Sequence, residues 1–173
     1  IVEEPVAVVF NGTTAAVMMA TPADVQDMAL GFALTEGYLK SLSEIESYEE
    51  VRHAKGVEAR FWVDAPCAEV IVERRRAMAG PVGCGLCGID SLEGVHRALP
   101  RVSGKLTLRP EQITRAMSAL TDWQPLKSAT RSTHAAGFYR PDTGIVAARE
   151  DVGRHNALDK LIGHMTRAGI DGS

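Results

Sequence analysis

The sequence predicts an α+β fold in two lobes: β-hairpins with one packed helix in the first lobe, and a mixed sheet of α/β character in the second. Three observations predict it. Apolar residues alternate with others around several turn signals, and apolar residues recur at helical spacing in three other segments. A glycine-rich stretch with two cysteines interrupts both patterns. We therefore place a first lobe at residues 1–105 and a second at 106–173.

The first lobe contains two predicted hairpins and a further strand. In "EPVAVVFNGTTAAVMMATP", two apolar strands flank Asn11 and Gly12, a pair that favours tight hairpin turns. The stretch "EEVRHAKGVEARFWVD" indicates a second hairpin that turns at Lys55 and Gly56. The alternating residues 68–74, "AEVIVER", predict another strand.

A helix is predicted between these two hairpins. It would begin at Thr21, because Pro22 suits the first helical position. Its buried face would consist of Val25, Met28, Ala29 and Phe32, which follow one-face spacing. We expect three acidic residues, Asp24, Asp27 and Glu36, on the solvent side of this helix.

The second lobe is predicted to run helix, hairpin, helix. Pro110 opens a helix in which Ile113, Ala116, Met117 and Leu120 share a face. "HAAGFYRPDTGIVAARED" is a hairpin that turns through residues 141–144. A last helix, about residues 156–167, would bury Leu158, Leu161, Ile162 and Met165. One hairpin is a thin sheet, so either further strands beyond this sequence or a neighbouring chain would cover its edge.

Composition restricts the class of protein. The 173 residues are 45% hydrophobic with a net charge of −3, which disfavours nucleic acid as the main partner. No apolar run approaches the roughly 20 residues of a membrane helix. The first residues lack the features of a secretory signal. Three cysteines are too few for a disulfide scaffold and indicate reduced thiols, hence a cytoplasmic protein.

Cys84 and Cys87 form a Cys-x-x-Cys pair within "GPVGCGLCGID". Structural zinc needs four ligands, so a zinc site would require His96 or His134, or a second chain's pair. A thioredoxin-like pair needs a helix start, which the surrounding glycines disfavour. An inert turn is a further alternative. A thiol on an open loop suits transfer of a group between two large partners.

Three motifs in order resemble the formate dehydrogenase accessory sulfurtransferases: "MMATPADVQDMALGFALTEGYL", "GCGLCG" and "AAREDVGRHNALDKLIG". The resemblance implies a sulfurtransferase that takes sulfur from a cysteine desulfurase as a cysteine persulfide. It would pass this sulfur to the molybdenum bis(molybdopterin guanine dinucleotide) cofactor of formate dehydrogenase. By motif, Cys84 carries the persulfide. Cys87 either expels the sulfur or assists.

The resemblance also implies that the second lobe has a cytidine deaminase-like three-layer fold. Deaminases place a His-x-Glu motif at a helix start, with a Pro-Cys-x-x-Cys partner downstream. The sequence instead reads His155-Asn156-Ala157, and no such partner follows. Deaminase chemistry is therefore not expected, and no metal site is predicted.

An anion site is predicted at the start of the last helix. Arg149, Arg154, His155 and Asn156 gather there, where free amides and the helix dipole attract anions. Asp151 could instead cap this helix, or Asn156 could do so with Asp159 as a capping pair. His134, at the mouth of a strand, is a further candidate for pterin or phosphate contact. The resemblance would place the cofactor's guanine dinucleotide at this site as cargo.

Two functions follow from these residues and the resemblance. The first is a sulfur carrier with a cysteine desulfurase and formate dehydrogenase as partners. The second is a non-catalytic chaperone that binds the molybdenum cofactor for formate dehydrogenase. A homodimer is expected because the thin second lobe and the apolar first strands would both gain from a symmetric partner. The resemblance also implies a further C-terminal stretch that contacts the cofactor in family members and that this sequence does not include.

Overall fold

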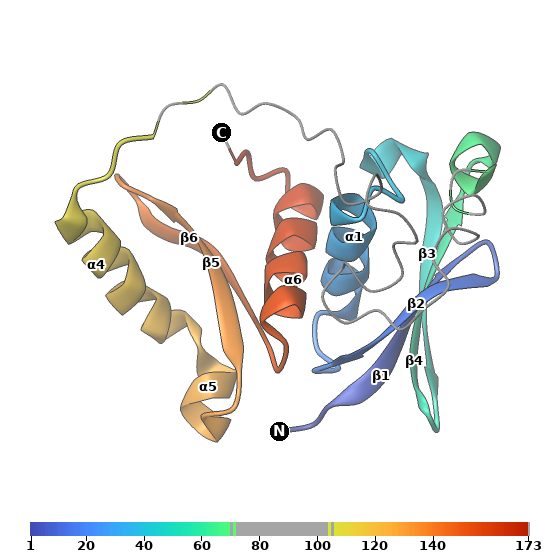
Figure 1. Cartoon of the computed structure of the whole chain (residues 1–173), viewed down its shortest axis with the longest axis horizontal. Helices are drawn as coiled ribbons and strands as arrows, with labels where there is room; N and C mark the ends of the chain where they lie inside the picture. Colours follow the sequence, from blue (N-terminus) through green and yellow to red (C-terminus); the bar gives the residue numbers. More distant parts are fainter. Residues whose placement is uncertain (70, 72–103, 105, 173) are drawn as a thin grey trace, which may run out of the picture.

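The computed structural model describes residues 1–69, 71, 104 and 106–172. In this part of the chain, two sheets flank a central pair of helices, α1 and α6 (Figure 1). The mixed α and β composition is as predicted. Cys84 and Cys87, and most of the predicted strand at residues 68–74, lie outside the described residues.

The first sheet has four strands in the order β2-β1-β4-β3. They span Glu4–Phe10 (β1), Thr13–Ala20 (β2), Ile45–His53 (β3) and Gly56–Val63 (β4). Both predicted hairpins are confirmed, because β1 pairs antiparallel with β2 and β3 with β4. The parallel pairing of β1 with β4 joins the two hairpins into one sheet.

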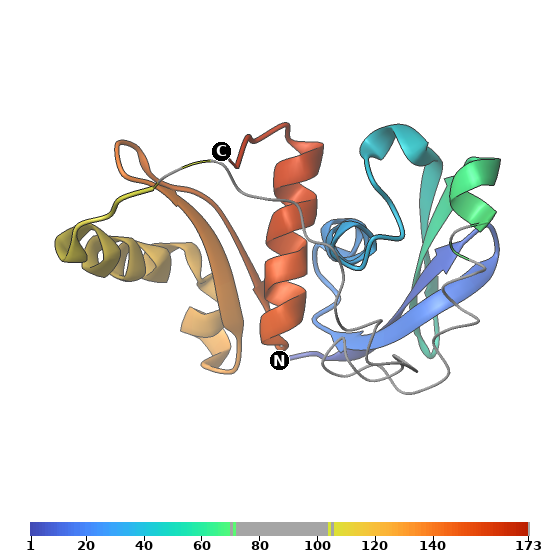
Figure 2. The same cartoon turned by 45° about the horizontal axis from the view of Figure 1, so that its top comes forward.

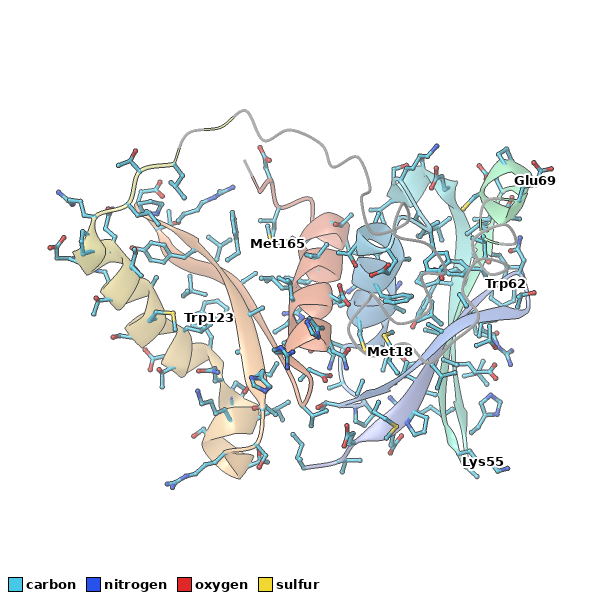
Figure 3. The ribbon with its side chains drawn as sticks, viewed as in Figure 1. Met18, Lys55, Trp62, Glu69, Trp123 and Met165 are labelled. Carbon is cyan, nitrogen blue, oxygen red and sulfur yellow. The ribbon has the colours of Figure 1, made fainter. Side chains whose placement is uncertain are left out.

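Helix α1 (Val25–Thr35) packs on the inner face of this sheet and begins later than predicted. The residue before it, Asp24, has φ 53°, a left-handed conformation that separates Thr21 and Pro22 from the helix. The four residues of the predicted buried face are all buried. They share a core with inward residues of the strands, against which Met18 packs in part (Figure 3).

The strand predicted at residues 68–74 is wrong where the structure describes it, because residues 65–69 and 71 are helical. The Asp64 carboxylate accepts a hydrogen bond from the Cys67 amide at 2.9 Å, as a helix-capping residue does. Pro66 follows closely, where a helix tolerates proline. Here local capping prevailed over apolar alternation.

The second lobe contains the predicted helix, hairpin and helix in that order, but a 3₁₀ turn and a short helix that were not predicted lie between the first helix and the hairpin. Its elements are α4 (Pro110–Leu120), a 3₁₀ turn η2 (Thr121–Trp123), α5 (Pro125–Thr130), β5 (His134–Arg140), β6 (Gly144–Asp151) and α6 (Arg154–Arg167). The Glu150 carboxylate accepts hydrogen bonds from the Leu126 and Lys127 amides, each at 2.7 Å, which fixes the start of α5.

Two predicted apolar faces in this lobe are more exposed than expected. On α4, Ile113 is 52% and Met117 65% exposed, and no residue of that helix is fully buried. On α6, Leu161 is buried, but Leu158 is 49% exposed. Both helices form as predicted. The prediction was wrong about burial, because the described residues leave parts of these apolar faces exposed.

Helices α1 and α6 lie side by side and join the two lobes (Figures 1 and 2). Two glycines allow their backbones to touch. A Cβ on Gly31 would lie 2.5 Å from the carbonyl carbon of Asp159, and one on Gly163 would lie 2.7 Å from that of Asp27. Among the described residues, no helix combines the length and apolar character needed to span a membrane.

Candidate functional site at the start of helix α6

Three of the predicted site residues gather at one end of the second lobe. Arg154 and His155 are the first two residues of α6, and both are exposed. His134 opens β5, is exposed, and pairs in register with Asp151, the last residue of β6. The structure therefore brings His134 to the same corner as the helix start.

The start of α6 has no side-chain cap. Gly153 occupies the capping position in an extended conformation. The capping pair considered for Asn156 and Asp159 is wrong, because the Asn156 amide donates to the Met19 carbonyl oxygen at 2.8 Å and to Asp151 Oδ1 at 3.1 Å. Asp159 Oδ1 accepts from the Thr35 hydroxyl at 3.0 Å. Among the described residues, no side chain caps the first amides of α6, which can therefore donate to another hydrogen-bonding partner.

Asp151 lies beneath this helix start and is fully buried. Its Oδ1 accepts from the Gly153 amide at 2.8 Å, and its Oδ2 accepts from the Thr21 amide at 3.0 Å. Lys160 Nζ lies 2.7 Å from Oδ2, and the Lys160 side chain is also fully buried. With the Asn156 amide on Oδ1, each carboxylate oxygen has two donors. This saturation compensates for burying the charge.

Arg149 is held away from the helix start by an acidic residue of the first lobe. Its Nη2 and Nε lie 2.9 and 3.0 Å from Asp27 Oδ2. The other carboxylate oxygen of Asp27, Oδ1, accepts a hydrogen bond from Arg167 Nε at 2.8 Å. The Asp27 side chain is only 3% exposed, so the expectation that it faces solvent is wrong. Burial and the neighbouring Arg149 lower the pKa of His164, which lies 3.7 Å from Asp27.

A signal for the burial of Asp27 is present in the sequence. Helix α1 reads "VQDMALGFALT", in which apolar residues surround the axis rather than forming one stripe. A helix of that kind is covered on more than one side. Both the sheet and α6 cover α1, and Asp27 faces the arginines brought by the second lobe. The identity of those arginines could not be inferred from local pattern.

Cys67 is the one cysteine within the described residues. It is 6% exposed, and its Sγ lies 3.4 Å from the Tyr38 carbonyl oxygen. Burial raises the pKa of its thiol, which keeps it protonated and poorly nucleophilic. The buried, structural role expected for Cys67 agrees with this environment.

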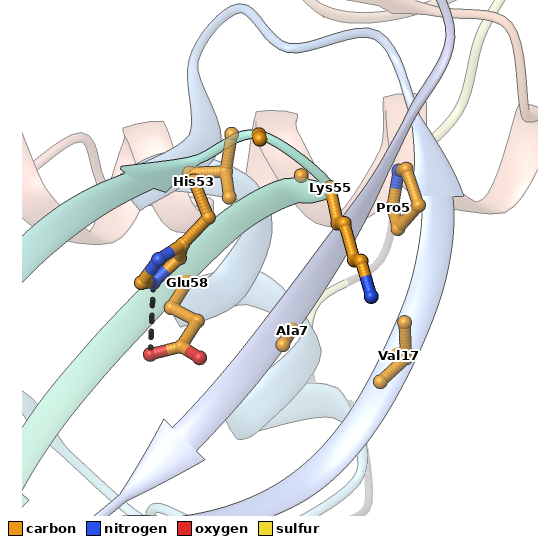
Figure 4. A pocket seen from close by; sticks show the side chains of 9 residues that line it. Pro5, Ala7, Val17, His53, Lys55 and Glu58 are labelled. Atoms are coloured by element: carbon orange, nitrogen blue, oxygen red, sulfur yellow. Dashed lines mark ion pairs between the residues drawn. The ribbon is translucent and has the colours of Figure 1, made fainter.

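A hollow of about 510 Å³ lies elsewhere, on the outer face of the first sheet. Pro5, Ala7 and Val17 line its apolar side, and the His53–Glu58 pair, 3.5 Å apart, lines its rim (Figure 4). None of the predicted site residues contributes to it. Within the described part of the chain, no group of three or more His, Cys, Asp or Glu side chains could hold a metal ion.

Comparison with known proteins identifies relatives along the whole sequence. A model of the FdhD/NarQ family matches residues 1–173. The chain is 50% identical over 169 residues to a sulfur carrier protein FdhD from Agrobacterium fabrum, covering 97% of this chain and 62% of that protein. It is 45% identical over 168 residues to the protein of the same name from Bordetella bronchiseptica, covering 97% and 61% respectively. The chain thus spans about three fifths of these relatives' length.

A solved structure has the same overall fold. It comes from Desulfotalea psychrophila and is described as a formate dehydrogenase accessory protein. The match has a TM-score of 0.66 at 22% identity and covers 96% of this chain and 60% of the other. At that identity the likeness concerns the fold alone.

Proposed function

Because the chain belongs to the FdhD/NarQ family, we propose that it is a sulfur carrier that serves formate dehydrogenase. It takes persulfide sulfur from a cysteine desulfurase and passes it to the molybdenum bis(molybdopterin guanine dinucleotide) cofactor. The observation that carries this proposal is the match along all 173 residues, which includes the Cys-x-x-Cys pair. The names of the relatives, sulfur carrier proteins, support the same function.

The sulfur-bearing residue in this proposal is Cys84. Its thiolate attacks the outer sulfur of the donor's persulfide; a new S–S bond forms on Cys84, the donor's S–S bond breaks, and the donor leaves as a thiolate. In one form of release, an acceptor thiolate attacks the outer sulfur, the S–S bond to Cys84 breaks, and Cys84 leaves as a thiolate. In the other, Cys87 attacks the sulfur of Cys84, a Cys84–Cys87 disulfide forms as hydrosulfide leaves, and a thiol reductant then reduces this disulfide to two thiols. The chain is thus a sulfurtransferase with a persulfide intermediate.

The chemistry of the third cysteine supports this assignment. The Cys67 thiol is buried and hydrogen-bonded, with a raised pKa. Attack on a persulfide needs an accessible thiolate. Of the three cysteines, Cys84 and Cys87 therefore remain as candidates, in agreement with the motif.

The cargo's guanine dinucleotide is proposed to bind at the start of α6. Exposed Arg154 and His155 stand at uncapped helix amides, and His134 opens the neighbouring strand. Guanidinium and backbone N–H groups at a helix start are suited to phosphate. Arg149 and Asn156, also predicted contacts, act indirectly in this proposal, because Asp27 and Met19 already engage their polar groups.

The finer structural predictions belong to the same proposal. They are a cytidine deaminase-like second lobe, a lobe boundary between residues 105 and 106, a homodimer and a cytoplasmic location. Among the described residues, the second sheet has only the strands β5 and β6, a small sheet that would gain from further strands or a second copy at its edge.

The test is sulfur loading followed by mass spectrometry. The folded protein is incubated with a cysteine desulfurase and cysteine, and the peptides are mapped without reductant. We expect the mass of one added sulfur on the Cys84 peptide, and its loss after reduction. Cys84→Ser should remove this adduct, whereas Cys67→Ala, the matched control, should retain it. Absence of the adduct from folded wild-type protein overturns the carrier function.

A maturation assay with Cys84→Ser and Arg154→Ala separates the carrier from a non-catalytic chaperone. If Cys84→Ser supports maturation of formate dehydrogenase as well as wild type, while Arg154→Ala abolishes it, the chaperone function is correct instead. Cys87→Ser then decides between the release steps. Retained loading with loss of sulfide release would assign the expulsion of sulfur to Cys87.

A further inference from the structure

Thr21 lies in the link between β2 and α1, yet its polar atoms are bound by the second lobe. The Thr21 hydroxyl accepts from the Val152 amide at 3.1 Å, and its own amide donates to Asp151 at 3.0 Å. Its carbonyl oxygen accepts from Lys160 Nζ at 3.0 Å. The residue is 6% exposed. Three long-range bonds thus join one threonine of the first lobe to both flanks of the α6 start.

These bonds fix the short connection between β6 and α6. Val152 and Gly153 are the only residues between the two elements. The Val152 amide is held by the Thr21 hydroxyl, and the Gly153 amide by Asp151. Because Gly153 supplies no side-chain cap, the connection has to be oriented by groups outside the helix. One of those groups, the Thr21 hydroxyl, comes from the other lobe.

The orientation of this connection sets the direction of the first amides of α6 and of the Arg154 and His155 side chains. Donors that are fixed before a ligand arrives bind it more tightly than donors that must first be ordered. Loss of one hydrogen bond to the connection should therefore weaken binding at the helix start. It should do so without removing any group that touches the ligand.

We propose that Thr21 is a positioning residue for the anion-binding start of α6, and that its hydroxyl couples the first lobe to that site. This inference rests on the proposed binding of the cargo's guanine dinucleotide at α6. No sequence pattern singles out Thr21 for this role. It lies 131 residues from Val152 along the chain.

The test compares two substitutions at Thr21 with one control. Thr21→Val keeps the side-chain shape and the backbone bonds but removes the hydroxyl acceptor; Thr21→Ser restores it. Thr35→Val is the matched control, because it removes another threonine hydroxyl that bonds to α6, at Asp159. Guanosine diphosphate is the probe, and its dissociation constant is measured by calorimetry at a temperature where circular dichroism shows all variants folded.

We expect Thr21→Val to raise the dissociation constant about threefold to tenfold, the range of one hydrogen bond's net contribution. Thr21→Ser and Thr35→Val should remain within about twofold of wild type, less than the effect of a typical hydrogen bond. Amide hydrogen exchange in the ligand-free protein should also accelerate at residues 152–156 in Thr21→Val but not in Thr35→Val.

The outcomes distinguish this inference from the function on which it rests. If wild type does not bind the probe, the proposed cargo site is wrong, and the role of Thr21 is overturned with it. If wild type binds and Thr21→Val binds equally well, only the positioning role is overturned. Equal weakening by Thr21→Val and Thr35→Val would indicate general loosening of the lobe contact, and would also overturn it.

Discussion

The contact between α1 and α6 predicts that a single added methyl group separates the two lobes. In Gly31→Ala, the new Cβ would lie 2.5 Å from the Asp159 carbonyl carbon and 2.9 Å from its Cα. Carbon atoms in contact ordinarily lie about 3.5–4.0 Å apart, so the helices must separate by about 1 Å. Both neighbouring atoms belong to backbone, so rotation of a side chain cannot relieve the clash.

The cost follows from that displacement. Overpacking of a filled interface costs about 1–3 kcal/mol and occasionally more, and a 1 Å gap removes much of the dispersion attraction across it. Alanine in place of glycine stabilises the helix by about 0.5–1 kcal/mol through its higher helix propensity, which offsets part of this cost. Because the clash is with backbone atoms, the upper part of the overpacking range, about 2–3 kcal/mol, applies, and we expect a net loss of about 1–2.5 kcal/mol in the free energy of unfolding. For a chain of this size, the melting temperature should fall by about 2–10 °C.

Thermal unfolding followed by circular dichroism measures this effect. Gly104→Ala is the control, because an added methyl there meets no atom of the described residues within 4 Å. Gly163→Ala should behave like Gly31→Ala, since its Cβ would lie 2.9 Å from the Gly31 amide nitrogen. The double variant should lose less than the sum of the two, because one displacement relieves both clashes. If Gly31→Ala melts within about 1 °C of wild type, the close backbone contact is refuted.

Two further predictions concern buried carboxylates. Asp27→Asn removes the charge that pairs Arg149 and Arg167, and should cost about 2–3 kcal/mol in urea unfolding, because those cations lose a buried partner. Asp24→Asn, on an exposed carboxylate 3.7 Å from Arg149, should cost less than about 0.5 kcal/mol; equal costs would contradict the role given to burial. Burial raises the pKa of Asp159 from 3.8 to about 6. The folded protein therefore binds this proton more tightly than the unfolded chain, and the resulting stabilisation is complete below pH 3.8 and is lost as the pH rises through 6. Asp159→Asn should therefore be more stable than wild type by up to about 2 kcal/mol near pH 7.5 and nearly equal to it near pH 4, and a difference independent of pH would contradict this.

The hairpins were predictable because their signals are short-range. Asn11 and Gly12 adopt positive φ angles of 46° and 78° in the first turn, which few other residue pairs allow. The buried face of α1 followed equally from local spacing. The strand prediction at residues 65–69 was wrong because two local signals conflict there. Capping by Asp64 predicts a helix, alternation in the following residues predicts a strand, and the sequence does not show which signal is stronger.

The sequence supplied candidate residues for the site but not their arrangement. The last motif indicated Arg154 and His155, the predicted strand entry indicated His134, and the structure brings these three to one corner. The last motif also suggested Arg149 as an anion ligand, and its guanidinium instead contacts Asp27. Thr21 and Lys160 were missed because a threonine in a linker and a lysine in a helix ordinarily face solvent.

The sequence alone determined the elements whose causes lie within a few residues: the turns, the helix periods, the Cys-x-x-Cys spacing and the charged helix start. Only the tertiary structure decided which charges are buried. Asp27, Asp151 and Lys160 are tolerated inside the protein because segments more than a hundred residues away supply their partners. Desolvation of a charge is costly unless such partners are present. A partner from the other lobe cannot be inferred from the residues that neighbour the charge in sequence.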